Sequence, residues 1–313
     1  MPKLILAVVG ALLLISGIAN DPRTAWPYWV IWAGTTALYL LLIRSGDYLE
    51  RALLVFCWFV AIVAISQVVG YCAGVRDAGF VPWRPSSFVN SSNILGEIMV
   101  WGMILAWKNN RRWSVGLFLS ILIMSGSRTS YLAAFAVIVV YVCNKNLFLL
   151  QILPPLVCGV SSILYFGSVL LGRMDIMSRV SPWIGAADIG GGIVGRGPGY
   201  LQEHLPAVTL HHNWHAHNVL LQAWGDLGAA GAISVIVLLV AIIRSATCKS
   251  SSSVWLWMFL AANITAGVLE YLYWLPGIGL LALLFYNRLS IEKSCTPAPV
   301  YADGISGIAS QVR

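Results

Sequence analysis

Long apolar stretches, separated by short polar ones, run along most of the chain and predict membrane-spanning helices. A helix needs about 20 apolar residues to cross a bilayer, and its backbone groups then bond within the segment itself. The stretches that follow this pattern, some of them short, are residues 4–19, 27–43, 52–71, 91–107, 113–124, 129–143, 147–171, 219–243, 254–268 and 272–287. We therefore expect an all-α polytopic membrane protein with about ten transmembrane helices.

The composition indicates the same class. Hydrophobic residues make up 59% of the 313-residue chain, charged residues only 10%, and the mean hydropathy is +0.81. Soluble domains carry about 25% charged residues, so a chain with so few charges cannot cover a water-exposed surface. The net charge of +7 then reflects membrane topology, and no nucleic-acid partner is expected.

The distribution of basic residues predicts the orientation of the chain. Cytoplasmic loops of membrane proteins carry an excess of Lys and Arg. An N-terminus in the cytoplasm puts most basic residues, including every lysine, on that side. The longest loop, residues 172–217, then lies outside, and the polar tail, residues 291–313, lies inside. Residues 4–19 also fit a signal peptide loosely, but a retained helix is the favoured interpretation.

The outer loop contains most of the candidate chemistry. All five histidines of the protein lie in it: His204, His211, His212, His215 and His217. The basic residues outside are all arginines, among them Arg179 and Arg196, and arginine suits bidentate binding of phosphate or carboxylate. The glycine-rich run at residues 190–199 is interpreted as a flexible loop, with a phosphate-binding backbone nest as the alternative. No lysine follows it as in a nucleotide P-loop.

Three further residues stand at positions with chemical consequences. His217 directly precedes the segment 219–243, which is expected to be a helix. A helix N-terminus disfavours the positive imidazolium, and the neutral imidazole that is favoured instead can accept a proton. A histidine that only caps the helix is the alternative. Arg128 lies close to the hydrocarbon, where arginine must pair, face water or extend to the interface. Asp226 is nine residues after His217, on the opposite side of an ideal helix, so direct contact between them is not expected.

Several short motifs together resemble the O-antigen ligase and polymerase superfamily. They are Ser127-Arg128-Thr129, Arg179 followed by Trp183, Gly195-Arg196-Gly197-Pro198-Gly199, His215-Ala216-His217-Asn218 and Asp226-Leu227-Gly228. Their order matches the family, as does the large loop ahead of the His-Asn pair, and the resemblance covers residues 113–288. The family usually has Glu where this chain has Asp226, and the chain is shorter than many members.

The resemblance implies an enzyme of the bacterial inner membrane that acts at its periplasmic face. Such enzymes transfer a glycan from an undecaprenyl diphosphate carrier to an acceptor, which is lipid A-core, another glycan or a protein. Attack at the anomeric carbon needs a base for the acceptor hydroxyl and cations for the departing diphosphate. The resemblance assigns the base to His217, with His215 as the second choice. It implies that the diphosphate is bound by Arg128, Arg179 and Arg196, with support from Asn218 and Asp226.

The expected organisation has four parts. Residues 1–171 form seven transmembrane helices, residues 172–217 the periplasmic catalytic loop, residues 218–290 three further transmembrane helices, and residues 291–313 a cytoplasmic tail. The expected partners are the carrier-linked glycan, its acceptor and membrane lipids, with neither a metal nor another cofactor.

Two alternatives from other classes remain open. A transporter or flippase would also be helical, but ionisable residues near the membrane midplane and inverted repeats would be expected, and little of either is visible. A metal-binding membrane protein would use His211 and His215, with His204 and His217. The loop lacks the cysteines or the His-Glu-x-x-His pattern that usually accompany such sites.

Overall fold

The computed structural model describes residues 2–20, 22–42, 46–74, 85–87, 91–143, 177–209, 216–247 and 254–269. These residues are mostly helical, and no β-strand occurs among them. The all-α class expected from the apolar pattern is therefore confirmed for the described parts of the chain.

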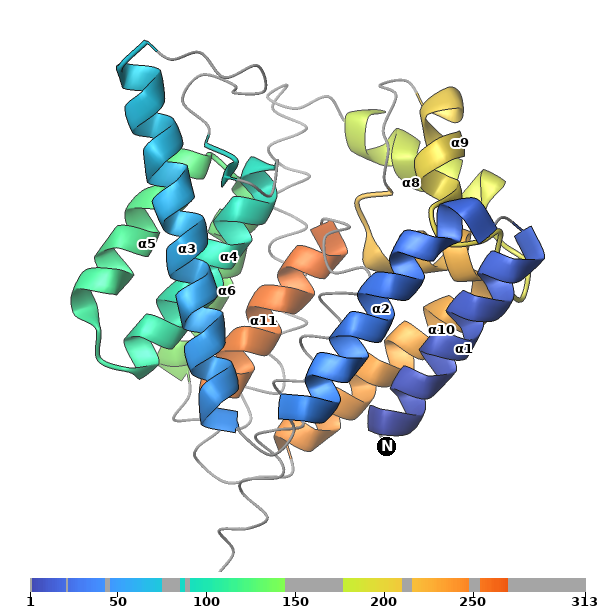
Figure 1. Cartoon of the computed structure of the whole chain (residues 1–313), viewed down its shortest axis with the longest axis horizontal. Helices are drawn as coiled ribbons and strands as arrows, with labels where there is room; N and C mark the ends of the chain where they lie inside the picture. Colours follow the sequence, from blue (N-terminus) through green and yellow to red (C-terminus); the bar gives the residue numbers. More distant parts are fainter. Residues whose placement is uncertain are drawn as a thin grey trace, which may run out of the picture.

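The helices form two groups, with α11 between them (Figure 1). The first group consists of α3 (Gly46–Cys72), α4 (Ser92–Lys108), α5 (Arg112–Ser125) and α6 (Arg128–Cys143). The second group consists of α1 (Pro2–Asn20), α2 (Pro22–Leu42), α8 (Met177–Ile189), α9 (Tyr200–Val208) and α10 (Val219–Thr247). Helix α11 (Val254–Leu269) contacts α4 and α6 of the first group and α10 of the second.

Eight of the predicted apolar segments are helices, namely α1 to α6, α10 and α11. The other two, residues 147–171 and 272–287, lie outside the described residues, as does the tail at 291–313. The predicted loop at 172–217 is more structured than its composition indicates. It contains α8 and α9, which pack against each other and against α10.

Two described helices are long and apolar enough to cross a membrane: Glu50–Cys72 in α3 and Val219–Val240 in α10. Both carry large apolar side chains on the outside of the molecule. Val55 and Ile62 of α3 are 67% and 58% exposed, and Ile233 of α10 is 59% exposed. Extended apolar surfaces of this kind are typical of proteins that contact lipid or another protein.

The interior of the first group is closely packed. Phe118 of α5 and Met99 of α4 are fully buried. Gly102 of α4 makes room for the Phe118 ring, which lies 3.0 Å from where a Cβ atom on this glycine would be. An ion pair between Lys108 and Glu50 joins the end of α4 to the beginning of α3.

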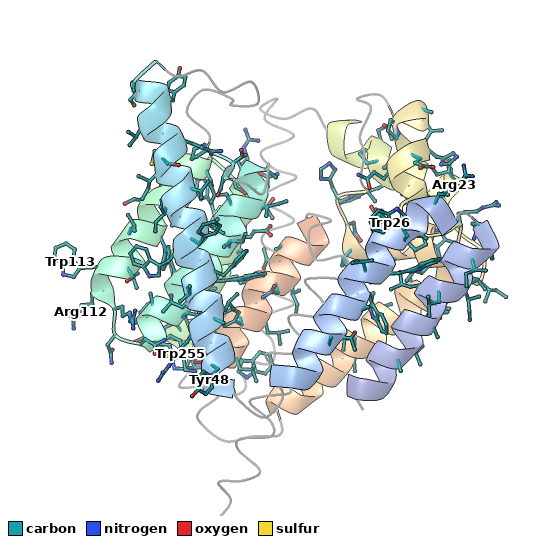
Figure 2. All side chains as sticks on the ribbon, viewed as in Figure 1. Arg23, Trp26, Tyr48, Arg112, Trp113 and Trp255 are labelled. Atoms are coloured by element: carbon teal, nitrogen blue, oxygen red, sulfur yellow. The ribbon has the colours of Figure 1, made fainter. Side chains whose placement is uncertain are left out.

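Aromatic and basic residues mark the two ends of the helices. Arg23 and Trp26 lie near one end, and Tyr48, Arg112 and Trp255 lie towards the other (Figure 2). Trp, Tyr and Arg are the residues that anchor helices at membrane interfaces. Helices α8 and α9 lie at the Arg23 end, opposite the turn that joins α4 to α5 (Figure 1).

Candidate active site at the break in helix α10

Helix α10 is interrupted at Gly228, which has φ 69° and ψ −164°. Glycine adopts this backbone conformation far more readily than any other residue. In an unbroken helix, the carbonyls of Gly225 and Asp226 would accept hydrogen bonds from the amides of Ala229 and Ala230. The break removes these partners, so all four backbone groups need others.

Residues 192–197 of the glycine-rich run supply the replacement partners. The hydrogen bonds run from Arg196 N to Gly225 O (3.3 Å), Gly197 N to Asp226 O (2.9 Å), Ala229 N to Gly192 O (2.9 Å) and Ala230 N to Ile193 O (3.1 Å). The run is therefore inserted into the hydrogen-bond ladder of α10. Its interpretation as a flexible loop is wrong, because its backbone completes a helix. The amides of Arg196 and Gly197 are also engaged in this way, which removes two donors from any phosphate-binding nest.

Glycines on both sides of the break allow this approach. A Cβ atom on Gly195 would lie 2.4 Å from the nitrogen of Gly228, and one on Gly228 would lie 2.4 Å from the nitrogen of Gly195. Both residues also have positive φ angles. One turn earlier, Gly225 makes room for Leu201 of α9, whose side chain lies 2.3 Å from the position of an added Cβ.

Asp226 is completely buried at the break and both of its carboxylate oxygens accept hydrogen bonds. Oδ1 accepts from the amide of Leu201 at 3.3 Å, at the beginning of α9. Oδ2 accepts from Nε2 of Gln222 at 3.0 Å. Gln222 in turn accepts a hydrogen bond from the amide of Ala216 through Oε1, at 3.1 Å. Asp226 is therefore linked, through Gln222, to the residue that precedes His217.

His217 lies immediately before the cap of α10. Asn218 caps the helix, because its Oδ1 accepts from the amides of Leu220 (2.9 Å) and Leu221 (3.2 Å). His217 itself has φ 50°, an uncommon value for a residue with a side chain. It is held between this cap and Ala216, which is fully buried. The imidazole is thus carried by a backbone that is fixed on both sides, as a catalytic group requires.

Helix α1 contributes two residues that the sequence did not suggest. Ser16 donates from its hydroxyl to the carbonyl of Asp226 at 3.0 Å. Asn20 donates to the carbonyl of Ser16 at 2.8 Å and approaches that of Gly195 at 3.4 Å. In the sequence these are ordinary small polar residues near the end of an apolar helix. Only their spacing of one helical turn places them on the same face.

The predicted arginines occupy different parts of the fold. Arg196 has an exposed side chain, while its amide is bonded to the break in α10. Arg179 lies in α8, which packs against α10 and α9, but the position of its side chain is outside the described set. Arg128 begins α6 and therefore belongs to the other group of helices (Figure 1).

The turn that presents Arg128 is itself held firmly. Ser127 and Ser130 are buried, and their hydroxyl oxygens lie 2.7 Å apart. The Ser130 hydroxyl also donates to the carbonyl of Asn93 in α4, at 3.2 Å. The Arg128 side chain is exposed at this turn. The backbone that carries the Arg128 side chain is thus anchored at one end of α6.

The remaining histidines do not form a described cluster. His204 is exposed on α9, where its ring stacks on Tyr200 with 4.0 Å between centroids. His211, His212 and His215 fall in the segment at 210–215 that is not described. Among the described residues, no three or more His, Cys, Asp or Glu side chains are grouped so as to hold a metal ion.

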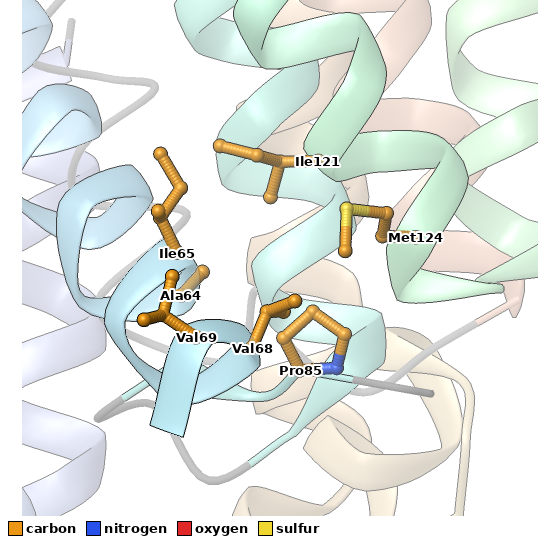
Figure 3. Close-up of a pocket in the computed structure, with 7 residues that line it drawn as sticks. All are labelled: Ala64, Ile65, Val68, Val69, Pro85, Ile121 and Met124. Carbon is orange, nitrogen blue, oxygen red and sulfur yellow. The ribbon is translucent and has the colours of Figure 1, made fainter. Parts of the chain in front are cut away.

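An apolar pocket lies away from these residues, between α3 and α5. It is lined by Ala64, Ile65, Val68, Val69, Pro85, Ile121 and Met124 (Figure 3). None of the predicted site residues lines it, and its lining offers no polar group for catalysis. Its apolar walls are suited to hydrocarbon.

No model of a known protein family matches the chain, and no curated protein matches it. The site is therefore defined by its own geometry. Hydrogen bonds of the backbone and of buried side chains link the beginning of α10, where His217 and Asn218 lie, to Asp226 and to the Arg196 amide at the break in the same helix. The imidazole of His217 and the exposed guanidinium of Arg196 are therefore carried by one connected set of residues.

Proposed function

We propose that this protein is a polytopic membrane glycosyltransferase. It transfers a glycan from an undecaprenyl diphosphate carrier to an acceptor hydroxyl at the periplasmic face of the bacterial inner membrane. The observation that carries the proposal is that one helix, α10, positions the backbone of both His217 and Arg196. His217 directly precedes the cap of α10, and the Arg196 amide is bonded to the break in the same helix.

The proposed reaction uses these groups in one displacement. The imidazole of His217 takes the proton from the acceptor hydroxyl, and the hydroxyl oxygen attacks the anomeric carbon of the carrier-linked sugar. The bond from this carbon to the diphosphate oxygen breaks, and its electron pair leaves with the diphosphate. Arg196, together with Arg179 and Arg128, stabilises the charge that develops there. His215 is the second candidate for contact with the acceptor.

The helices support the proposed placement in a membrane. The exposed apolar faces of α3 and α10 support contact with lipid. Together with the apolar segments at 147–171 and 272–287, the sequence offers about ten candidate spans. The end that carries α8 and α9 faces the periplasm in this proposal, and the turn between α4 and α5 faces the cytoplasm.

A transporter is the second candidate, because broken membrane helices often line substrate sites in transporters. In this protein, however, four backbone groups at the break in α10 are bonded to residues 192–197. These groups are then not available to coordinate a transported ion or substrate. Because the backbone groups at the break already have partners, we infer that the break is structural and helps to hold the segment that carries His217.

The proposal is tested with purified protein in lipid nanodiscs. Undecaprenyl diphosphate-linked glycan is added with lipid A-core, a second carrier-linked glycan or an acceptor protein, and the products are identified by mass spectrometry. Transfer to one acceptor by the wild type, but not by His217→Ala, is expected. Movement of the carrier-linked glycan across the bilayer of proteoliposomes without a new glycosidic bond would instead identify a transporter.

A further inference from the structure

Gln222 is a buried residue of α10 that none of the sequence motifs includes. Its side chain is 3% exposed. Nε2 donates to Oδ2 of Asp226 at 3.0 Å, and Oε1 accepts from the amide of Ala216 at 3.1 Å. The amide group of Gln222 therefore bridges a buried carboxylate and the residue immediately before His217.

The orientation of this bridge follows from the chemistry of its partners. A backbone amide can only donate, so the oxygen of Gln222 must face Ala216. Oδ1 of Asp226 already accepts from the amide of Leu201 at 3.3 Å, so Oδ2 is the oxygen that receives the Gln222 donor. The carboxylate accepts at both oxygens, as its ionised form does. Each contact therefore has one defined donor and one defined acceptor.

We propose that Gln222 is a positioning residue for His217, an inference that rests on the proposed transfer reaction. It holds Ala216 on one side of His217, while the Asn218 cap holds the other side. Asp226 acts in turn by fixing Gln222. The acidic residue of the motif thus affects the base through a neutral amide and a backbone group, without needing direct contact with the imidazole.

Because the donor and the acceptor of each contact are defined, the effect of exchanging the Asp226 carboxylate and the Gln222 carboxamide can be predicted. In Asp226→Asn, one amide N–H must face another donor, whichever way the new carboxamide and that of Gln222 rotate. In Gln222→Glu, two carboxylates face each other across 3.0 Å. The double variant satisfies these three contacts again: residue 226 accepts from Leu201 and donates to residue 222, which accepts from Ala216. It also retains the single buried charge.

The experiment compares the wild type, both single variants and the double variant by steady-state kinetics of glycan transfer. Each single variant should lower kcat by about 10- to 100-fold, with little change in KM for the carrier-linked glycan, since a misplaced base affects the chemical step. The double variant should recover most of this loss. Gln67→Glu is the matched control, because Gln67 of α3 also uses both ends of its amide in partly buried contacts, to the backbone of Ser87. It should lower the Tm without lowering kcat.

A second measurement does not depend on activity. Diethyl pyrocarbonate modifies His217, and the rate is measured by mass spectrometry with His204 on α9 as the internal reference. The single variants should change the rate at His217 several-fold relative to His204, and the double variant should restore it. If the wild type transfers no glycan while this pattern holds, the proposed function fails and the positioning role stands. Additive losses in the double variant, in kcat and in labelling alike, would overturn the positioning role.

Discussion

The amide of Gly197 donates a 2.9 Å hydrogen bond to the carbonyl of Asp226, a group that would accept from Ala230 if α10 were continuous. The residue that replaces a helical partner thus comes from a distant segment, earlier in the chain. Its neighbours in the run are bonded to the same break, so the site depends on two segments folding together. The backbone itself, more than any side chain, joins them.

Substitution of the glycines at this junction should destabilise the protein. Gly228→Ala and Gly195→Ala each place a Cβ atom 2.4 Å from a backbone nitrogen and impose a strained positive φ. The strain alone costs about 1–3 kcal/mol, and the clash adds to it because backbone cannot rotate away. A lower Tm is expected for the purified protein in detergent, measured by intrinsic fluorescence.

Two glycines of the same chain separate strain from clash. Gly74 has φ 81° and nothing within 4 Å of an added Cβ, so Gly74→Ala reports the strain alone. Gly34 in α2 has neither restriction, so Gly34→Ala should be neutral or slightly stabilising. Equal Tm values for Gly228→Ala and Gly74→Ala would show that the close approach at the break contributes nothing.

The helices were predictable from the sequence because a long apolar run is a property of each segment by itself. The apolar run of α3 or α10 is visible without knowledge of its neighbours. The insertion of residues 192–197 into α10 was not predictable, because it is a backbone contact between distant segments. The glycines at 190–199 and those at Gly225 and Gly228 were visible, but nothing in either pattern indicated the other as its partner.

The candidate site also combines residues that a single segment indicates with residues whose contacts only the folded chain reveals. His217, Asn218 and Asp226 were selected from a motif in the sequence, whereas the contacts of the Asp226 carboxylate with Gln222 and Leu201 became visible only in the structure. Gln222 and Ser16 could not be identified, since isolated polar residues in apolar helices usually bond within their own helix. Their role depends on which segment packs against them.

The arginines provide a test of diphosphate binding. If Arg128, Arg179 and Arg196 hold the diphosphate with two parallel hydrogen bonds, substitution by lysine removes the fork while the charge remains. Arg128→Lys, Arg179→Lys and Arg196→Lys should each lose most glycan transfer, with a raised KM for the carrier-linked glycan. The measurement is initial-rate kinetics in nanodiscs at fixed acceptor concentration.

Arg112→Lys is the control for these variants. Arg112 is exposed at the opposite end of the helices (Figure 2), and arginine and lysine are equivalent in a purely interfacial role. Its kinetics should match the wild type. Near-normal transfer by all three site variants would remove the diphosphate clamp from the mechanism and leave Arg196 with a structural role through its amide alone.

The orientation of the chain can be measured independently of catalysis. Alkaline phosphatase is active only after export, so a fusion after Leu205 in α9 should be active, and a fusion after Asn109, between α4 and α5, should be inactive. The reason is the group of three basic residues at this turn, Lys108, Arg111 and Arg112. The opposite pattern in bacterial cells would place α8 and α9 in the cytoplasm and exclude a carrier-linked glycan at the periplasmic face.

The last prediction distinguishes a catalytic base from a metal ligand. A general base contributes typically about 10²–10⁴-fold to the rate, so His217→Ala should reduce transfer to this extent or below detection. The fold should persist, because the cap of α10 is made by Asn218 and the break is held by backbone bonds. Circular dichroism and the Tm check this point.

His204→Ala is the matched variant, because His204 is exposed on α9 and its ring stacks on Tyr200. It should retain nearly full transfer. At a metal site, several of His204, His211, His215 and His217 would be essential together, and incubation with EDTA followed by gel filtration would abolish the activity. We expect that one histidine is indispensable and that EDTA leaves the activity unchanged, because a general base accepts a proton without the help of a metal ion. Full transfer by His217→Ala would mean that another group takes the proton of the acceptor hydroxyl. His215→Ala is then the variant to measure first.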